Sequence, residues 1–246
     1  MNFFTHIMHL VGSAGVAYVY SSQIRDPLTR PNVLAGFQLA ESGSVPFLSA
    51  LSQRATAEGD DWLAEKLTKH ASDETKHGQI FAYALKQLNK QVIDFKNLPE
   101  TKTDKPTERR RSPFFAAFFE GYSQEQLNPD VIDWQVFMAS TYILELDASK
   151  DFARMANVLP ENELTSRNLK QGMLSIAKDE TAHAAYLYEA MMRRWPRAEV
   201  QQLIDKWRSR KTSAVLAMVS NVVQQRGKMT SLVQDRVSND SELVAA

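Results

Sequence analysis

Two segments far apart in the chain repeat nearly the same residues, in the order Asp, Glu, Thr, one further residue and His. They are SDETKH at residues 72–77 and KDETAH at residues 178–183. In each segment the histidine follows the glutamate by three positions, so both side chains would lie on one face of a helix. A carboxylate and a neutral imidazole held side by side are suitable ligands for a metal ion.

Apolar residues at helical spacing surround each Glu–His pair. The pair lies in the middle of a stripe of residues spaced three or four positions apart. A helix with such an apolar stripe packs it against the protein core. The sequence therefore predicts that both pairs point inward. The first stripe consists of Leu63, Leu67, His70, Glu74, His77, Phe81, Ala84 and Leu88, and the second of Leu169, Met173, Ile176, Glu180, His183, Leu187 and Ala190.

Two further acids interrupt apolar stripes in other predicted helices. The separation between Glu41 and Glu74 is nearly the same as that between Glu145 and Glu180. Two antiparallel helices of about thirty residues joined by a short turn bring their midpoints level at such a separation. We therefore predict two helical hairpins, each of which supplies two glutamates and one histidine to a shared centre.

Burying four carboxylates in one core is costly, because they repel one another unless they are protonated or bound to cations. Two divalent or trivalent metal ions would balance them, with carboxylates bridging the ions and one histidine completing the coordination of each. The predicted metal ligands are Glu41, Glu74, His77, Glu145, Glu180 and His183.

The elements that must position these ligands are predicted to be helices, and strand signals are nearly absent. We expect a single all-α domain whose core covers about residues 30–195. Thr29 is the predicted N-cap of the first core helix, in which Pro31 occupies the first turn. The predicted core helices span residues 31–57, 60–89, 129–157 and 163–194, with a charged linker at 90–112, a short apolar helix after it, an N-terminal helix within 1–25 and a C-terminal helix at 198–237.

Composition excludes several classes of site. The chain has 246 residues and 29 residues of each charge sign, so no overall field favours nucleic acid or an anionic membrane. It has no cysteine, which excludes iron–sulfur clusters, thiolate zinc sites and a cysteine nucleophile. We expect a cytoplasmic protein. The N-terminal segment carries no charge before Arg25, and we interpret it as a helix covered by protein, with a membrane-associated segment as the alternative.

The pattern of two inward glutamates, each followed by a Glu-x-x-His helix, resembles the ferritin-like di-iron carboxylate superfamily. One Glu-x-x-His is a weak signal, whereas two with matching partners are specific. The resemblance covers about residues 30–195 and implies a four-helix bundle, to which this chain adds N-terminal, inserted and C-terminal helices. It also implies two iron ions as cofactor, with a manganese pair or a mixed manganese–iron pair as variants.

The aspartates in front of the two pairs resemble the oxygen-activating branch of that superfamily, in which such an aspartate bonds a ligand histidine of the opposite pair. By this resemblance Asp73 would support His183, and Asp179 would support His77, fixing the tautomer of each imidazole. Solvated helix acids are the alternative. Among residues within one turn of the ligands, Thr141 could relay protons and Tyr142 or Tyr186 could donate an electron, with Gln38 also close. Ordinary packing is the favoured explanation for each of them.

The resemblance implies an oxidoreductase that uses dioxygen to hydroxylate, desaturate or cleave an apolar substrate, either free or bound to a carrier. It further implies an electron donor such as a ferredoxin or a reductase, and we expect a homodimer. Nucleic acid is not an expected partner, although basic clusters near residues 108–112, 193–197 and 206–211 leave a docking face open. The alternative is a protein that oxidises iron or removes peroxide, in the manner of ferritin or rubrerythrin.

Two residues next to the predicted ligands leave the interpretation open. His70 lies one turn before Glu74 on the same stripe and could be an extra ligand, but the pattern of four acids and two imidazoles is already complete. We therefore interpret it as a hydrogen-bonded core histidine. Pro46 cannot donate to the carbonyl of Ser42, so the first core helix is expected to kink or bulge near Glu41.

Overall fold

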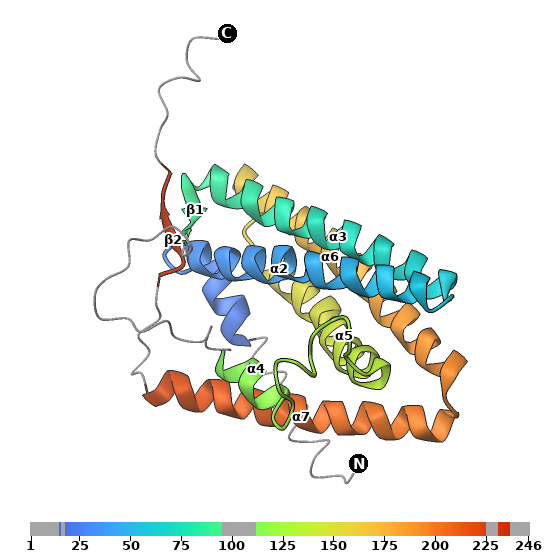
Figure 1. The fold of residues 1–246 in the computed structure, drawn as a ribbon. Helices are drawn as coiled ribbons and strands as arrows, with labels where there is room; N and C mark the ends of the chain where they lie inside the picture. The colour runs from blue at the N-terminus through green and yellow to red at the C-terminus, as the bar shows by residue number, and fades with distance from the viewer. Residues whose placement is uncertain (1–14, 16–17, 95–111, 225–230, 237–246) are drawn as a thin grey trace, which may run out of the picture.

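The computed structural model describes residues 15, 18–94, 112–224 and 231–236 (Figure 1). This part of the chain is mostly helical, as the sequence predicts. A further helical segment at residues 18–25 precedes the main elements. The helices are α2 (Arg30–Ala57), α3 (Asp61–Gln87), α4 (Pro113–Phe118), α5 (Trp134–Val158), α6 (Leu164–Arg194) and α7 (Arg197–Gln224), and the strands are β1 (Lys90–Val92) and β2 (Val233–Asp235).

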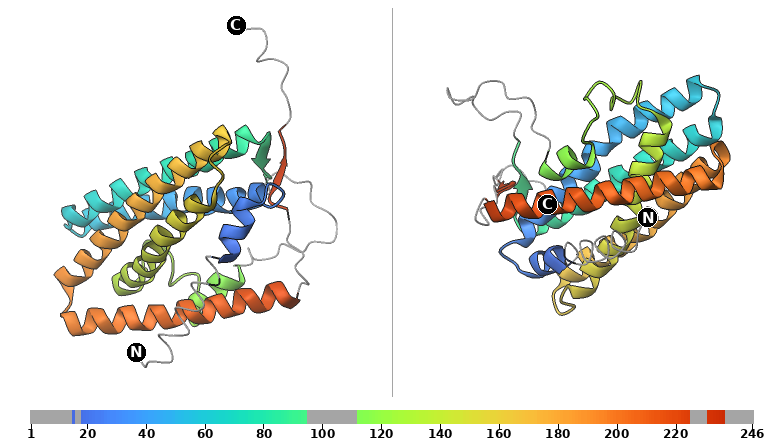
Figure 2. Two further views of the ribbon diagram at one scale, coloured as in Figure 1. Left: turned by 180° about the vertical axis from the view of Figure 1, so that it is seen from behind. Right: turned by 90° about the horizontal axis from the view of Figure 1, so that it is seen from below.

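Four long helices form two hairpins. Helix α2 lies side by side with α3, and α5 lies side by side with α6 (Figures 1 and 2). The hairpins meet where α3 packs against α6, whereas α2 and α5 make no close backbone contact in the described part of the chain. Aromatic side chains bridge that wider space, since the ring centroids of Phe37 and Phe152 lie 5.1 Å apart. Helix α7 crosses one side of this arrangement with α4 packed against it (Figure 1).

The core consists of two apolar clusters at opposite ends of the long helices. On α3, for example, Leu63 and Leu67 belong to one cluster, and Phe81 and Leu85 belong to the other. The same division holds on α2, α5 and α6. The predicted ligand residues lie between the two clusters, so the apolar packing on both sides holds the middle of each helix in place.

Side-chain capping explains where two of the long helices begin. The carboxylate of Asp60 accepts a hydrogen bond from the backbone N–H of Leu63 at 2.9 Å, which caps α3. Asp133 caps α5 by accepting from the N–H of Gln135 at 2.6 Å. The predicted start of this helix at Pro129 was therefore wrong. Thr29 occupies the cap position of α2, but its hydroxyl donates to the carbonyl of Gln23 at 2.7 Å and caps nothing.

The predicted end of the C-terminal helix was also wrong. Helix α7 is described to Gln224, and residues 233–235 form strand β2, which pairs antiparallel with β1. The predicted linker at 90–112 therefore begins with a strand, and its residues 95–111 lie outside the described residues. Residues 1–14, 16 and 17 of the predicted N-terminal helix also lie outside them.

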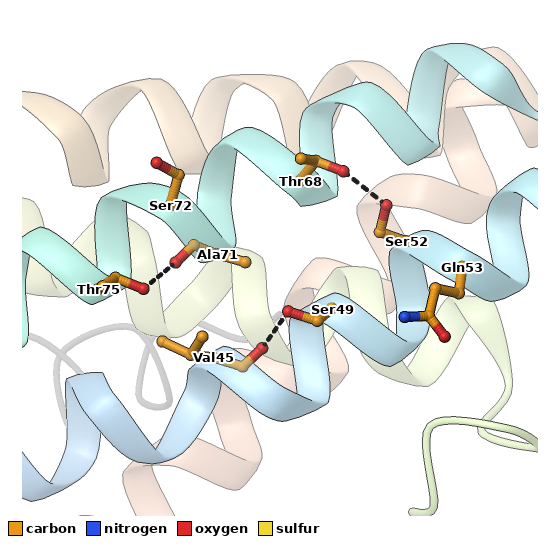
Figure 3. A pocket seen from close by; sticks show the side chains of 8 residues that line it. All are labelled: Val45, Ser49, Ser52, Gln53, Thr68, Ala71, Ser72 and Thr75. Carbon is orange, nitrogen blue, oxygen red and sulfur yellow. Dashed lines mark hydrogen bonds between the residues drawn. The ribbon is translucent and has the colours of Figure 1, made fainter.

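Small polar residues line the seam between α2 and α3. Ser52 Oγ donates to the carbonyl of Ala64 and shares a hydrogen bond with Thr68 Oγ1, both at 2.8 Å (Figure 3). Helix α2 is uninterrupted from Arg30 to Ala57 although it contains Pro46, so the expected bulge near Ser42 is absent. None of the described helices has an uncharged apolar stretch long enough to cross a lipid bilayer.

The contact between α3 and α6 depends on a glycine. A Cβ atom added at Gly172 would lie 2.6 Å from a methyl group of Ile80, so no larger residue fits without a shift of the helices. Gly43 on α2 differs, because a Cβ atom there would meet nothing within 4 Å.

We predict that Gly172→Ala lowers the free energy of unfolding by about 1–3 kcal/mol through overpacking. Gly43→Ala is the matched control and should raise it by about 0.5–1 kcal/mol, because alanine favours a helix over glycine. Chemical denaturation of both variants measures the two values. Stabilisation by Gly172→Ala would contradict the packing at this seam.

Candidate metal centre

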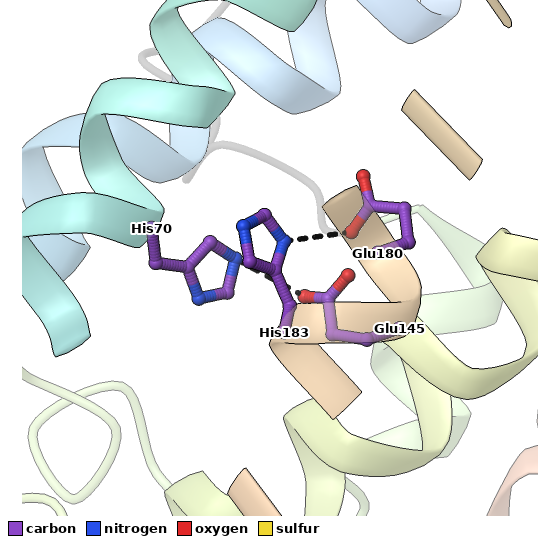
Figure 4. Close-up of side chains that lie close together, drawn as sticks. All are labelled: His70, Glu145, Glu180 and His183. Atoms are coloured by element: carbon purple, nitrogen blue, oxygen red, sulfur yellow. Dashed lines mark hydrogen bonds and ion pairs between the residues drawn. The ribbon is translucent and has the colours of Figure 1, made fainter. Parts of the chain in front are cut away.

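The six predicted ligand residues converge from four helices at the middle of the protein. Glu41 comes from α2, Glu74 and His77 from α3, Glu145 from α5, and Glu180 and His183 from α6. His70 on α3 joins them, as Figure 4 shows for one half of the centre. The donor atoms form two groups, in each of which they lie within 4.8 Å of one another: Glu41, Glu74, His77 and Glu180, and His70, Glu145, Glu180 and His183.

His77 is the centre of the first group. Its Nδ1 atom lies 3.4 Å from a carboxylate oxygen of Glu41, 3.5 Å from Glu74 Oε1 and 3.2 Å from Glu180 Oε1. The hydroxyl of Ser44 donates to Glu74 Oε2 at 3.0 Å, which leaves Oε1 of that carboxylate directed at the centre. Three carboxylates from three helices thus surround one imidazole nitrogen.

The second group contains two imidazoles. His183 Nδ1 lies 2.9 Å from Glu180 Oε2 and 3.7 Å from Glu74 Oε1. His70 Nε2 lies 3.3 Å from Glu74 Oε1 and 3.5 Å from Glu145 Oε1. Glu74 and Glu180 therefore face both groups, which is the position that carboxylates bridging two ions would occupy.

Aspartates occupy the outer nitrogens of two of these histidines. Asp73 Oδ2 lies 3.3 Å from His183 Nε2, and Asp179 Oδ2 lies 3.3 Å from His77 Nε2. Each contact joins α3 to α6, in the pairing that the resemblance implies. Asp73 also binds the ammonium groups of Lys69 and Lys76, and these contacts outweigh the effect of burial and lower its pKa to about 2.

The donor set fits metal ions because it consists of carboxylate oxygens and imidazole nitrogens. A neutral imidazole has one N–H, so a histidine whose Nε2 donates to an aspartate turns an Nδ1 lone pair toward the carboxylates. Glu74 Oε1 and His77 Nδ1 are buried and have no hydrogen-bond partner of acceptable geometry in the described part of the chain. Two cations among these atoms would satisfy all of them at once.

The pKa values show how strongly the centre attracts positive charge. Burial alone would lower the pKa of His77, but Glu180, Glu41 and Glu74 raise it to about 12. Burial raises the pKa of Glu41 to about 8, and burial together with the charge of Glu180 raises that of Glu145. Without metal, the centre therefore holds protons that a cation would displace.

His70 lies among the donor residues, although the sequence analysis interpreted it as a core histidine and not as a ligand. Its ring stacks on that of His183 with a centroid distance of 3.7 Å, and its Nδ1 lies 2.8 Å from the hydroxyl of Tyr186. Burial lowers its pKa to about 4, so the imidazole is neutral near pH 7. The sequence signal was its place on the inward stripe one turn before Glu74. We set it aside because six ligands already completed the pattern.

Of the other residues predicted to lie near the ligands, one contacts a donor group. Tyr186 is buried and contacts the second group through His70. Tyr142 packs on Tyr188 at a centroid distance of 5.8 Å, away from the donor atoms. Gln38 lies in a groove between α2 and α3, and Thr141 makes no side-chain hydrogen bond with the described residues.

Comparisons with protein-family models, with curated protein sequences and with solved structures found no match.

We predict that metal binding releases protons. Near pH 6 the metal-free centre holds a proton on His77 and one on Glu41, and burial, which raises the pKa of Glu145, favours a proton there as well; these protons must leave when cations enter. Apparent affinity should therefore rise with pH, by about tenfold per unit for each proton released. Above about pH 8 the contribution of Glu41 disappears, whereas that of His77 remains. Calorimetric titrations with Co²⁺ in buffers of different ionisation heat measure the released protons, and binding without release would contradict this electrostatic account.

We also predict that Asp73→Asn and Asp179→Asn each weaken metal binding by about 10- to 100-fold, because the amide fixes the tautomer and basicity of the ligand histidine less well. Asp61→Asn, on an exposed first turn of α3, is the control and should leave the affinity unchanged. Titration of the metal-free proteins measures all three. Unchanged metal affinity in both Asp73→Asn and Asp179→Asn would identify these aspartates as ordinary solvated helix acids.

Proposed function

We propose that this protein is a ferritin-like di-iron oxidoreductase that uses dioxygen to oxidise an apolar organic substrate. The observation that carries this proposal is an apolar cavity that reaches Glu41, one of the donor residues of the centre. The arrangement of two helical hairpins around buried glutamates and histidines supports the ferritin-like assignment.

The proposed ions would be held by the two donor groups, with Glu74 and Glu180 between them. Iron suits a mixed set of carboxylates and imidazoles, and a manganese pair or a mixed pair suits the same ligands. A bound iron pair supplies the reduction of dioxygen, which amino-acid side chains alone do not perform. The protein supplies the arrangement of ligands and the exclusion of water.

The cavity has a volume of about 420 Å³, which lies within the range of small-molecule sites. It lies between α2 and α5, where these helices do not meet, and α4 and α7 close it on the outer side. Its walls are mainly apolar, and they include Phe37 from α2, Phe114 from α4, Leu144 and Phe152 from α5, and Val215 from α7.

The chain's own residues would direct a substrate toward the centre. The aromatic walls exclude water and favour an apolar chain or ring over a polar molecule. Glu41 is the only donor residue among the described lining residues, so a substrate in this cavity approaches the centre at the first group. Two charged residues, Asp151 and Lys211, also line the cavity. Lys211 is paired with Asp147 at 2.5 Å.

The cavity favours an oxygenase over the alternative of an iron-oxidising or peroxide-removing protein. Such a protein needs the donor groups but no chamber for an organic molecule. Helices α4 and α7, which lie outside the two hairpins, form part of the chamber wall and so acquire a role in substrate binding. An external electron donor and a homodimer accompany this proposal, because reduction of dioxygen requires electrons and because the helices outside the two hairpins suit dimer contacts better than assembly of a cage.

The test is to load the metal-free protein with ferrous iron under anaerobic conditions and to measure oxygen uptake with and without acyl, aldehyde and aromatic compounds. We expect two irons per chain and uptake that accelerates with one of these classes. Val215→Trp fills the cavity from α7, which carries no donor residue, and should reduce the substrate-dependent uptake by about tenfold or more while two irons still bind. Leu216→Trp, the exposed neighbour on the same helix, is the control.

Two results would contradict the proposal in different ways. Oxygen uptake with two irons that no compound accelerates, and that Val215→Trp leaves unchanged, would favour the iron-oxidising alternative. Failure to bind metal would reject the centre itself.

A further inference from the structure

The two hairpins supply equivalent glutamate and histidine donors, but the residues beside these donors differ between the hairpins at two positions. Superposing the Glu–His pairs aligns Glu74 with Glu180 and His77 with His183. Four residues before each glutamate stand His70 in one hairpin and Ile176 in the other. The same exchange of a polar for an apolar residue occurs three positions after each histidine.

Tyr186 follows His183 by three positions, and Ile80 is its counterpart after His77. His70 and Tyr186 hydrogen-bond to each other at one end of the centre. Ile176 and Ile80 belong to the apolar cluster at the other end. A polar pair therefore replaces an apolar pair on one side only, and the polar pair is buried, with His70 1% and Tyr186 7% exposed.

The contact with Tyr186 determines what His70 offers to the centre. The tyrosine oxygen can accept the Nδ1 proton of His70, which leaves the lone pair on Nε2. That atom lies 3.3 Å from Glu74 Oε1 and 3.5 Å from Glu145 Oε1, and so faces the second donor group. Stacking on His183 holds the ring in this orientation.

We propose that His70 is a third imidazole ligand and that it makes the two metal positions unequal. Glu74 and Glu180 would serve both metal positions. Glu41 and His77 at one position correspond to Glu145 and His183 at the other. His70 is therefore the donor that has no counterpart. Because Glu74 Oε1 faces both His70 and His183, sharing of Glu74 and Glu180 gives the position beside His183 five protein ligands and the position beside His77 four. The position beside His183 then binds its ion more tightly and fills first. The inference rests on the metal centre of the proposed function, but not on oxygen chemistry.

The difference between the two metal positions predicts which metal each would prefer. Imidazole suits iron and the later metals, whereas a site rich in carboxylates suits manganese. The position beside His77, with three carboxylates and one imidazole, would therefore accept manganese more readily than the position beside His183. With Glu74 counted at both positions it also has one protein donor fewer, and it adjoins the cavity through Glu41, so an external ligand finds room for coordination there.

The experiment is a stepwise Co²⁺ titration of the metal-free protein, followed by proton NMR of the loaded form. We expect two binding steps that differ by about tenfold or more, since loss of even an outer partner of a ligand costs about 10- to 100-fold in metal affinity. Cobalt shifts the exchangeable ring N–H signal of each ligand histidine far outside the usual range. Three such signals are expected, and two of them, from His183 and from His70 as the partner of Tyr186, should appear in the first step.

His70→Ile is the decisive variant, because it installs the residue that the other hairpin already carries at this position. The first binding step should weaken by about tenfold or more, and one shifted signal should disappear. Tyr186→Phe should shift or broaden that same signal while both ions still bind, which tests the contact if His70→Ile does not fold. Circular dichroism of the metal-free proteins monitors folding.

Two shifted signals in the wild-type protein, or equal binding steps that His70→Ile does not change, would overturn the proposal and return His70 to the role of a core histidine. Either result would leave a two-ion centre, and with it the proposed function, intact. Binding of no cobalt by the wild-type protein would instead reject the centre.

Discussion

The structure depends on the attraction between buried carboxylates and positive charge. Glu74 and Glu180 each face histidine nitrogens of both donor groups, and Glu41 and Glu145 add a further acid on either side. Within the described part of the chain, the ion pairs of these four glutamates all involve histidines, and none involves a lysine or arginine. Protons can neutralise part of this charge, as the raised pKa values of His77 and Glu41 show, but protons leave two buried polar atoms without partners. Metal ions would both neutralise the carboxylates and give these two buried atoms a partner.

The fold answers that constraint by holding the middle of each helix rigid. Apolar clusters lie on both sides of the donor residues, so each long helix is fixed at two places and its polar centre cannot shift along the axis. The seam at Gly172 lets α3 and α6 approach closely. The contacts of Asp73 with His183 and of Asp179 with His77 then connect the same two helices through the ligands themselves. Packing of the hairpins and orientation of the imidazoles are thus coupled.

Much of this arrangement could be predicted from the sequence because helical periodicity is a strong local signal. The inward stripes located the long helices and brought Glu41, Glu74, Glu145 and Glu180 to one level. Strands β1 and β2 were missed since three residues are too few to show alternation. The start of α5 was misplaced because Asp133, and not the earlier Pro129, caps the helix. The cavity could not be predicted, since its walls come from segments whose approach depends on tertiary packing.

The near-symmetry of the two hairpins makes their difference informative. A centre built from two equivalent halves would have no reason to place a polar pair at one end and an apolar pair at the other. His70 and Tyr186 add a buried hydrogen bond at the end where the second donor group lies. At the other end Ile176 belongs to the same apolar cluster as Phe37 and Phe152, two of the residues that line the cavity reaching Glu41. If two ions occupy this centre as we propose, the one beside His183 has the additional imidazole of His70 as a ligand, whereas the one beside His77 adjoins the cavity through Glu41.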